Sequence, residues 1–178
     1  MNNSAREMWS RRIFDRLVEE GVELFGYVPD AGNKAIIEMA EESNATRPVL
    51  LTSEEEGIAV SAGADLVGKR AVVCMQSSGV GNCPNFLALI EGAKFPLLMI
   101  VTMRGDYGEQ NPWQYPMGQA VEPILKAMGV RCLRVDTVTD LDDALEAAIG
   151  AAFKAGQAVA LILSQRFLGA KPFGGGAN

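Results

Sequence analysis

The sequence predicts an α/β fold, a three-layer α/β/α domain built on a six-stranded, mostly parallel sheet. Short apolar runs of strand length alternate along the chain with longer segments whose apolar residues recur at helical spacing. One run, residues 96–102, is apolar without interruption, as in a strand that helices cover on both faces. A chain of 178 residues is long enough to bury such a core as one domain.

The first element is a helix expected over residues 4–20, in which Trp9, Ile13 and Leu17 share one face and which Gly21 ends. Glycine, proline or capping residues bound most of the later elements. In chain order these are a strand at 22–28, a helix at 34–42, a strand at 49–52, a helix at 54–67, a strand at 71–75, a helix at 84–93, a strand at 96–102, a helix at 117–128, a strand at 131–135, a helix from 139 or 140 to 155, and a strand at 158–163.

Two helix starts have specific signals. Ser53 followed three residues later by Glu56 is a capping box, so Glu54, Glu55 and Glu56 fall in the first helical turn. The helix dipole favours carboxylates there, which is a purely structural reason for all three. Pro84 suits the first residue of a helix, and the glycine-rich residues 76–82 before it let a ligand approach the backbone.

The long segment at residues 103–116 is rich in polar residues, and loops of this length are usually functional or mobile. Residues 1–167 are expected to form the domain. Residues 168–178 have too little apolar surface to pack and are expected to form a flexible tail.

Composition excludes several classes of function. The net charge is −6 and no run of Lys or Arg exceeds two residues, so nucleic acid is not an expected partner. No apolar stretch reaches membrane-spanning length and no signal peptide is visible, which predicts a cytoplasmic protein. Three widely spaced cysteines fit reduced thiols. Histidine is absent, which removes Ser-His-Asp and Cys-His catalysis and the commonest zinc ligand, and we predict no metal ligands in this chain.

Cys83 lies near a predicted helix N-terminus, where a thiolate nucleophile is conceivable, but no partner base is visible and a small apolar filler is the simpler interpretation. The loops after four expected strands, at 29–33, 53–56, 76–82 and 103–116, should share one edge of the sheet. That edge is therefore the expected ligand site.

The segments VPDAGNKAII, EEEGIAVSAGADLVGKRAVVCMQSSGVGN and PLLMIVTMRGDYGEQNPWQYPMGQA resemble the pyrimidine-binding (N-terminal) domain of thiamine diphosphate enzymes. Within that superfamily the chain is most similar to alpha subunits of sulfopyruvate decarboxylases, with phosphonopyruvate decarboxylases as neighbours. The resemblance implies a carboxy-lyase that is active only with a partner subunit. Its expected reaction converts sulfopyruvate to sulfoacetaldehyde and carbon dioxide.

The resemblance also implies roles for individual residues. Glu55, two positions before the glycine of a Glu-x-Gly step, matches the glutamate that hydrogen-bonds the N1′ nitrogen of the cofactor's aminopyrimidine ring and relays a proton there. Glu54 is then a helix-turn charge and Glu56 half of the capping box. The other expected cofactor contacts are Gln76, Ser78, Gly79 and Asn82. Asp30 matches a substrate-binding position, although an Asp after Pro29 is equally a turn former.

The sequence departs from the wider superfamily in two places. Met103, Arg104 and Gly105 stand where relatives carry a histidine pair, so acid–base help must come from elsewhere. Arg104 suits a sulfonate or phosphonate, and pyruvate would leave it unpaired, although a structural arginine is equally compatible. The Gly-Asp-Gly motif that holds diphosphate and Mg²⁺ is absent, Gly105-Asp106-Tyr107 being the nearest approach. A beta subunit is therefore expected to supply the part of the cofactor site that holds the diphosphate and Mg²⁺, in an α2β2 or larger assembly.

Three other functions remain open at this stage. A phosphonopyruvate decarboxylase subunit would use the same residues on a different anion. A non-catalytic stabilising subunit of a thiamine diphosphate enzyme would not need Glu55. A dinucleotide-binding oxidoreductase is suggested by Gly79-Val80-Gly81, but Pro84 replaces the third glycine and the loop follows the third strand instead of the first.

Overall fold

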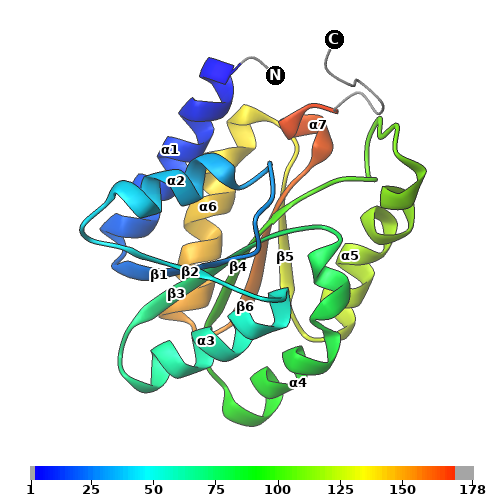
Figure 1. Ribbon diagram of the computed structural model, residues 1–178. Coiled ribbons are helices and arrows are strands. Elements are labelled where there is room, and N and C mark those ends of the chain that lie inside the picture. Colours follow the sequence, from blue (N-terminus) through cyan, green and yellow to red (C-terminus); the bar gives the residue numbers. More distant parts are fainter. Residues whose placement is uncertain (1–2, 171–178) are drawn as a thin grey trace.

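A computed structural model describes residues 3–170, with side chains from Met8 onward. It confirms the α/β prediction: six strands form one sheet in the order β2-β1-β3-β4-β6-β5, and every neighbouring pair is parallel (Figure 1). The strands are β1 Val22–Tyr27, β2 Arg47–Leu50, β3 Arg70–Gln76, β4 Leu97–Thr102, β5 Arg131–Val135 and β6 Ala158–Leu163. The sheet is thus fully parallel where the sequence predicted a mostly parallel one.

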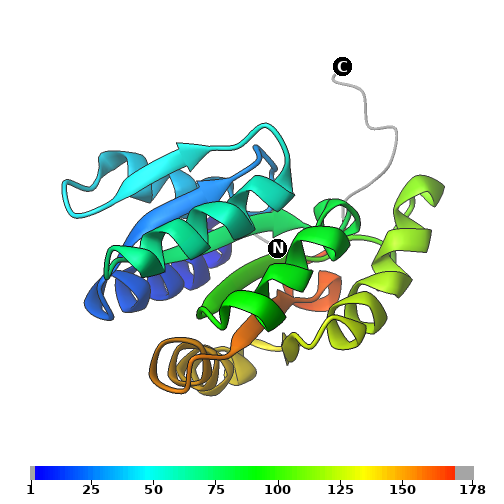
Figure 2. The ribbon, with the colours of Figure 1, turned by 90° about the horizontal axis from the view of Figure 1, so that it is seen from below.

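Helices cover both faces of this sheet (Figure 1, Figure 2). The α-helices are α1 Asn3–Glu19, α2 Lys34–Glu42, α3 Glu54–Leu66, α4 Pro84–Ala93, α5 Tyr115–Ala127, α6 Leu141–Ile149 and α7 Gln165–Leu168. Shorter turns are η1 Gly79–Asn82, η2 Pro112–Gln114, η3 Val138–Asp140 and the π-helical η4 Gly150–Lys154. One apolar core joins α1, α2 and α6 to the sheet, and a second joins α3, α4 and α5 to the opposite face.

The central strands agree most closely with the prediction. β4 and β6 are buried along their whole length, as expected of uninterrupted apolar runs between two helical layers. The edge strand β2 differs: the prediction gave residues 49–52, whereas the strand is Arg47–Leu50. It pairs only with β1 and is exposed or half-buried throughout. Pairing with β1, which apolar periodicity does not report, therefore sets its ends.

Proline explains a second difference. Helix α5 begins at Tyr115, two residues before the predicted start, and Pro116 occupies its first turn. A proline costs nothing there because the first N–H groups of a helix have no intrahelical partner. Pro112 opens η2 in the same way, so the irregular loop is shorter than predicted.

The N-cap of the sixth helix is also shifted. Thr137 and Asp140 form a capping box that opens η3, and η3, α6 and η4 together replace the single helix expected to run to residue 155. At the other end of the chain Leu168, predicted to begin a loose tail, is buried in α7. The adjacent Phe167 packs against Trp9 at 5.6 Å between ring centroids. Residues 171–178 of the predicted tail lie outside the described residues.

No helix between residues 3 and 170 is long and apolar enough to cross a membrane. The three cysteines are unpaired thiols.

Candidate active site

Loops that follow β1, β3, β4 and β6 meet at the carboxyl edge of the sheet, the edge at which parallel α/β sheets bind ligands (Figure 1). They enclose a small pocket of about 70 Å³. Three of the predicted site residues, Asp30, Gln76 and Arg104, line this pocket together with Thr102 and Gln165. The convergence of strand-end loops that the sequence predicts is therefore present.

The Asp30 carboxylate holds the turn that follows β1. Its Oδ1 accepts hydrogen bonds from the N–H groups of Gly32 and Asn33, and its Oδ2 accepts one from Asn33 Nδ2 at 2.9 Å. The Thr102 hydroxyl donates to Oδ1 from β4, which lies beyond β3 in the sheet. Asp30 thus has the turn-forming role that the sequence allowed, and it lines the pocket with a carboxylate that is already hydrogen-bonded.

Arg104 is paired within the chain, which corrects the expectation that it would lack a partner without a doubly anionic substrate. Its Nε donates to Glu109 Oε2 at 3.0 Å and its Nη2 donates to Oε1 at 2.8 Å. The Glu109 side chain is fully buried, whereas the Arg104 side chain keeps 28% of its surface exposed. The pair is formally neutral, so any substrate anion meets a guanidinium whose charge Glu109 partly offsets.

Buried Glu109 also accepts hydrogen bonds from the N–H groups of Gln110 and Asn111 and from Gln165 Nε2. The Arg104 guanidinium, followed by these donors, holds the pKa of the Glu109 carboxyl at about 2. The segment expected to be a functional or mobile loop is therefore fixed around an ionised side chain.

Glu109→Gln is expected to lower the free energy of unfolding by about 3 kcal/mol at about pH 7, because the folded pKa of Glu109 lies well below its unfolded value. A depressed carboxyl pKa stabilises the fold in full above the unfolded pKa of 4.5 and loses that effect as the pH falls towards 2. Urea unfolding of both proteins at about pH 7 and about pH 3 measures the difference. Exposed Glu91→Gln is the control, and a Glu109→Gln deficit that is equal at both pH values contradicts the assignment.

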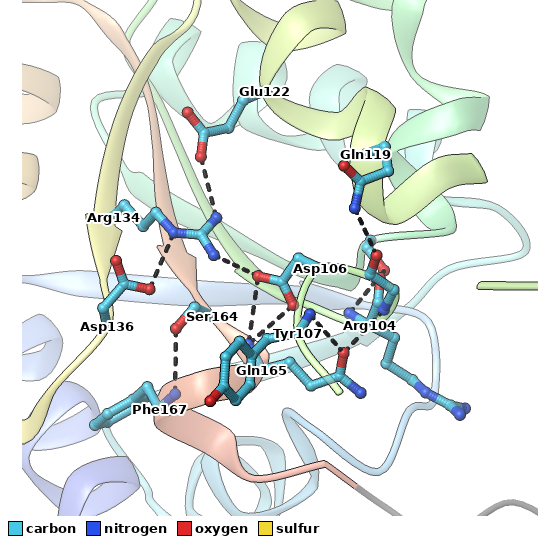
Figure 3. Close-up of polar contacts among 12 residues, drawn as sticks. Arg104, Asp106, Tyr107, Gln119, Glu122, Arg134, Asp136, Ser164, Gln165 and Phe167 are labelled. Carbon is cyan, nitrogen blue, oxygen red and sulfur yellow. Dashed lines mark hydrogen bonds and ion pairs between the residues drawn. The ribbon is translucent and has the colours of Figure 1, made fainter. Parts of the chain in front are cut away.

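A second polar cluster ties the same loop to its neighbours (Figure 3). Arg134 on β5 contacts Asp106, Glu122 and Asp136, and the Gln165 backbone N–H donates to Asp106 at 3.1 Å. Gln165 Oε1 accepts hydrogen bonds from the backbone N–H groups of Gly105 and Tyr107 (Figure 3). Asp106, the centre of the nearest approach to a Gly-Asp-Gly motif, is thus used to anchor the loop.

Gln165 and Glu109 were missed by the sequence analysis although both support the pocket. Gln165 directly follows the buried strand β6, so the strand-end rule that selected the other loops applies to it as well. Glu109 had no comparable signal, since one carboxylate in a polar loop normally faces water.

The first turn of α3 distributes its three carboxylates differently from the prediction. Glu54, expected to be a helix-turn charge, is only 9% exposed and accepts a hydrogen bond from Asn82 Nδ2 at 2.8 Å. Glu56 Oε2 accepts a hydrogen bond from the backbone N–H of Thr52 at 2.7 Å. Ser53 is the N-cap residue but makes no side-chain capping bond, so the predicted capping box does not form.

The Ser53 hydroxyl instead donates to Glu55, which is half-buried in the first turn of α3. That hydrogen bond, followed by one from a backbone N–H, lowers the pKa of Glu55 below its ordinary value. Glu55 is consequently ionised at neutral pH. It does not line the pocket that contains Asp30 and Arg104.

The glycine-rich residues after β3 form the 3₁₀ turn η1 in place of an open loop. The Ser78 hydroxyl donates to Gln76 Oε1 at 3.2 Å, and Ser78 and Asn82 are exposed on the sheet edge. Gly79 is buried under Glu54: a Cβ at Gly79 would lie 2.3 Å from Glu54 Oε1. A side chain at position 79 would therefore have to displace the Glu54 side chain, a packing constraint that the sequence alone did not reveal.

This arrangement weighs against two of the alternatives. A carboxylate packed on the glycine turn disfavours the pyrophosphate that a dinucleotide-binding turn would hold. Burial raises the pKa of the Cys83 thiol to about 12, with the nearby charge of Glu54 as the second cause, so Cys83 is not a thiolate nucleophile. No group of three metal-ligating side chains is assembled within residues 3–170.

Comparison with known proteins identifies the family of this chain. Residues 9–120 match the family model described as thiamine pyrophosphate enzyme, N-terminal TPP binding domain. The chain is 32% identical to the sulfopyruvate decarboxylase subunit alpha of Methanocaldococcus jannaschii over 86% of its own length and 91% of that subunit. It is 33% identical to the phosphonopyruvate decarboxylase of Streptomyces viridochromogenes over 67% of its length and 31% of that enzyme.

A similar solved structure is the 2-oxoglutarate:ferredoxin oxidoreductase of Magnetococcus marinus, with a TM-score of 0.67. The sequence identity is 17%, and the match covers 88% of this chain and 28% of that one. At this identity the likeness concerns the fold alone.

Proposed function

The chain belongs to the family of thiamine pyrophosphate enzymes that share the N-terminal TPP binding domain, and from this premise we propose that it is the alpha subunit of a decarboxylase that converts sulfopyruvate to sulfoacetaldehyde and carbon dioxide. The proposal is supported by three relatives named sulfopyruvate decarboxylase subunit alpha, which are 32%, 35% and 33% identical to this chain and are covered over 91%, 74% and 73% of their own lengths.

The residues of this chain fit the pyrimidine half of thiamine diphosphate. Glu55 is ionised, half-buried and has local hydrogen-bond partners, so its carboxylate is suited to share a proton with the N1′ nitrogen of a cofactor held between two subunits. Bound thiamine diphosphate supplies the electron sink for the carbanion that remains when carbon dioxide leaves. Gln76, Ser78, Gly79 and Asn82 are proposed to border the cofactor, with Gly79 acting through its packing under Glu54.

A beta subunit is proposed to hold the diphosphate and Mg²⁺, since this sequence contains no Gly-Asp-Gly triplet. An α2β2 or larger assembly would then complete each site at an interface. Three unpaired thiols suit a reducing compartment, and we place the complex in the cytoplasm.

The pocket is proposed to receive the substrate, with Asp30 on one side and the exposed part of the Arg104 guanidinium on the other. A terminal sulfonate would be recognised by that guanidinium. Glu109 offsets part of its positive charge, which tunes the contact and also keeps the guanidinium in position.

In the complex of this chain with its beta subunit, Arg104→Ala is expected to lower kcat/KM for sulfopyruvate relative to pyruvate by roughly ten- to a hundredfold, the cost of losing one charged contact. Because Arg104→Ala alone leaves Glu109 buried and unpaired, the double variant Arg104→Ala/Glu109→Gln is the matched form that keeps this region neutral. Steady-state turnover of sulfopyruvate, phosphonopyruvate and pyruvate provides the ranking.

Retention of the wild-type ranking in both variants removes the anchor role of Arg104. A clear preference of the wild-type complex for phosphonopyruvate assigns the chain to the second candidate, which the 33% identity to such an enzyme keeps open.

A further inference from the structure

The segment between β4 and the body of α5 exposes large aromatic side chains beside the candidate site. Trp113 is 86% exposed, Tyr107 57% and Tyr115 43%. All three lie within nine residues of one another, directly after the loop that carries Arg104. Trp113 lies in η2 and Tyr115 is the first residue of α5. We call these two residues the aromatic edge.

This part of the surface is almost free of charge. Between residues 107 and 121 the sequence has one charged residue, Glu109, and its side chain is fully buried. Over the whole chain 21% of residues are charged. Depletion of charge together with enrichment of tryptophan and tyrosine distinguishes the centre of a protein–protein interface from ordinary surface.

The aromatic edge is held rigidly. Asn111 Oδ1 accepts a hydrogen bond from the backbone N–H of Trp113 at 3.1 Å, and the Tyr115 hydroxyl donates to the Glu109 carbonyl oxygen. Beneath them Gly105, at φ +84°, lets the chain approach so closely that a Cβ would lie 2.0 Å from the Gln114 carbonyl oxygen. With its backbone already fixed, Trp113 has only its two side-chain torsions to order on binding, which suits an anchor residue.

The same surface is continuous with the cofactor-side residues. The Met117 Sδ lies 3.2 Å from the position that a Cβ at Gly81 would occupy, so the start of α5 rests on η1. Asn82 of η1 in turn donates to Glu54, the neighbour of Glu55 in the first turn of α3. Contact therefore runs from the aromatic edge through η1 to the helix end that presents Glu55.

Resting on the function proposed above, we propose that the aromatic edge is the anchor surface for the beta subunit, with Trp113 as the residue that inserts into it. A subunit that completes the site beside Glu55 must approach the carboxyl edge of the sheet, where Trp113 stands. The occupant of this surface is thus the chain that carries the diphosphate half of the site, and its complementary surface is a pocket with apolar walls.

Two measurements test this with the co-purified complex of the chain and a beta subunit, which is selected as a chain that contains the Gly-Asp-Gly motif. Trp113→Gln is expected to raise the dissociation constant by roughly thirtyfold or more, the loss typical of truncating a central interface residue. Leu66→Gln is the matched control, because Leu66 is also 86% exposed but ends α3 at the opposite edge of the sheet. It should change the dissociation constant by no more than about twofold.

The second measurement uses the only two tryptophans of the chain. In Trp9→Phe, Trp113 is the sole tryptophan; its emission should be quenched by acrylamide in the free chain and should become protected and shift to shorter wavelength when the beta subunit binds. A beta subunit without tryptophan, or one substituted to remove it, keeps the signal specific. If Trp9→Phe does not fold, loss of acrylamide quenching on complex formation in wild type, and not in Trp113→Phe, reports the same event.

The outcomes separate this inference from the function it rests on. An active complex in which Trp113→Gln binds as tightly as wild type, or in which Leu66→Gln weakens binding as much, overturns the anchor surface and leaves the decarboxylase intact. Protection of Trp113 already in the free chain also overturns it, because the chain itself or a second copy then covers the surface. A wild-type chain that does not associate with the beta subunit contradicts both.

Discussion

Glu55→Gln is expected to reduce kcat of the assembled complex by roughly 10²- to 10⁴-fold, the range for removing a group that relays a proton. A glutamine still accepts a hydrogen bond but cannot share a proton with the pyrimidine nitrogen. Assembly and stability should be unaffected, since the hydrogen bonds of Glu55 are local and glutamine is close to glutamate in size. Steady-state decarboxylation by complexes of equal subunit composition, checked by gel filtration, measures the effect.

Glu56→Gln is the matched control for Glu55→Gln. It changes the next carboxylate in the same helical turn, whose partner is the Thr52 N–H, and a glutamine oxygen can accept that bond as well. Activity close to wild type is expected. An assembled Glu55→Gln complex with full activity would instead identify the chain as a non-catalytic stabilising subunit.

The second large effect is the dependence of cofactor binding on the partner. The isolated chain is expected to bind thiamine diphosphate with Mg²⁺ more weakly than micromolar, because the diphosphate carries most of the ligand's charge and this sequence has no Gly-Asp-Gly segment to receive it. The co-purified complex should bind it at micromolar concentration or below. Calorimetric titration of cofactor and Mg²⁺ into both preparations provides the comparison, with thiamine alone as a control for the pyrimidine contact.

Most of the fold was predictable because its determinants are local. Buried strands such as β4 and β6 are uninterrupted apolar runs, and α2 has the predicted bounds because its apolar face is strongly periodic. The edge strand β2 was displaced because its ends depend on pairing with β1, which no local pattern reports. Strand ends that depend on non-local pairing therefore could not be predicted from the sequence.

For the candidate site, the sequence predicted which loops come together but not which way each side chain points. The strand-end rule correctly grouped Asp30, Gln76 and Arg104 around one pocket. It could not tell which of Glu54, Glu55 and Glu56 turns inward, because successive helical residues point about 100° apart and the choice depends on what packs above the turn. Here Gly79 and Asn82 pack against Glu54, which is buried, whereas Glu55 stays half-buried.

Electrostatic partners were the least predictable feature. Arg104 looked like an unpaired anion anchor, yet the buried Glu109, five residues further along, holds it by two hydrogen bonds. Whether a charged loop residue turns inward depends on donors brought from elsewhere in the chain, here Gln165 after β6. Such a cluster exists only once the sheet has brought the loops together.

If this chain contributes half of a divided decarboxylase site, activity should depend on both subunits. Turnover of sulfopyruvate is measured with this chain alone, with the beta subunit alone, and with increasing ratios of the two, in the presence of thiamine diphosphate and Mg²⁺. Neither chain alone is expected to turn over sulfopyruvate, and activity should saturate when the two are equimolar. Turnover by the isolated chain, or an equimolar complex that remains inactive on sulfopyruvate and on phosphonopyruvate, would contradict the divided site.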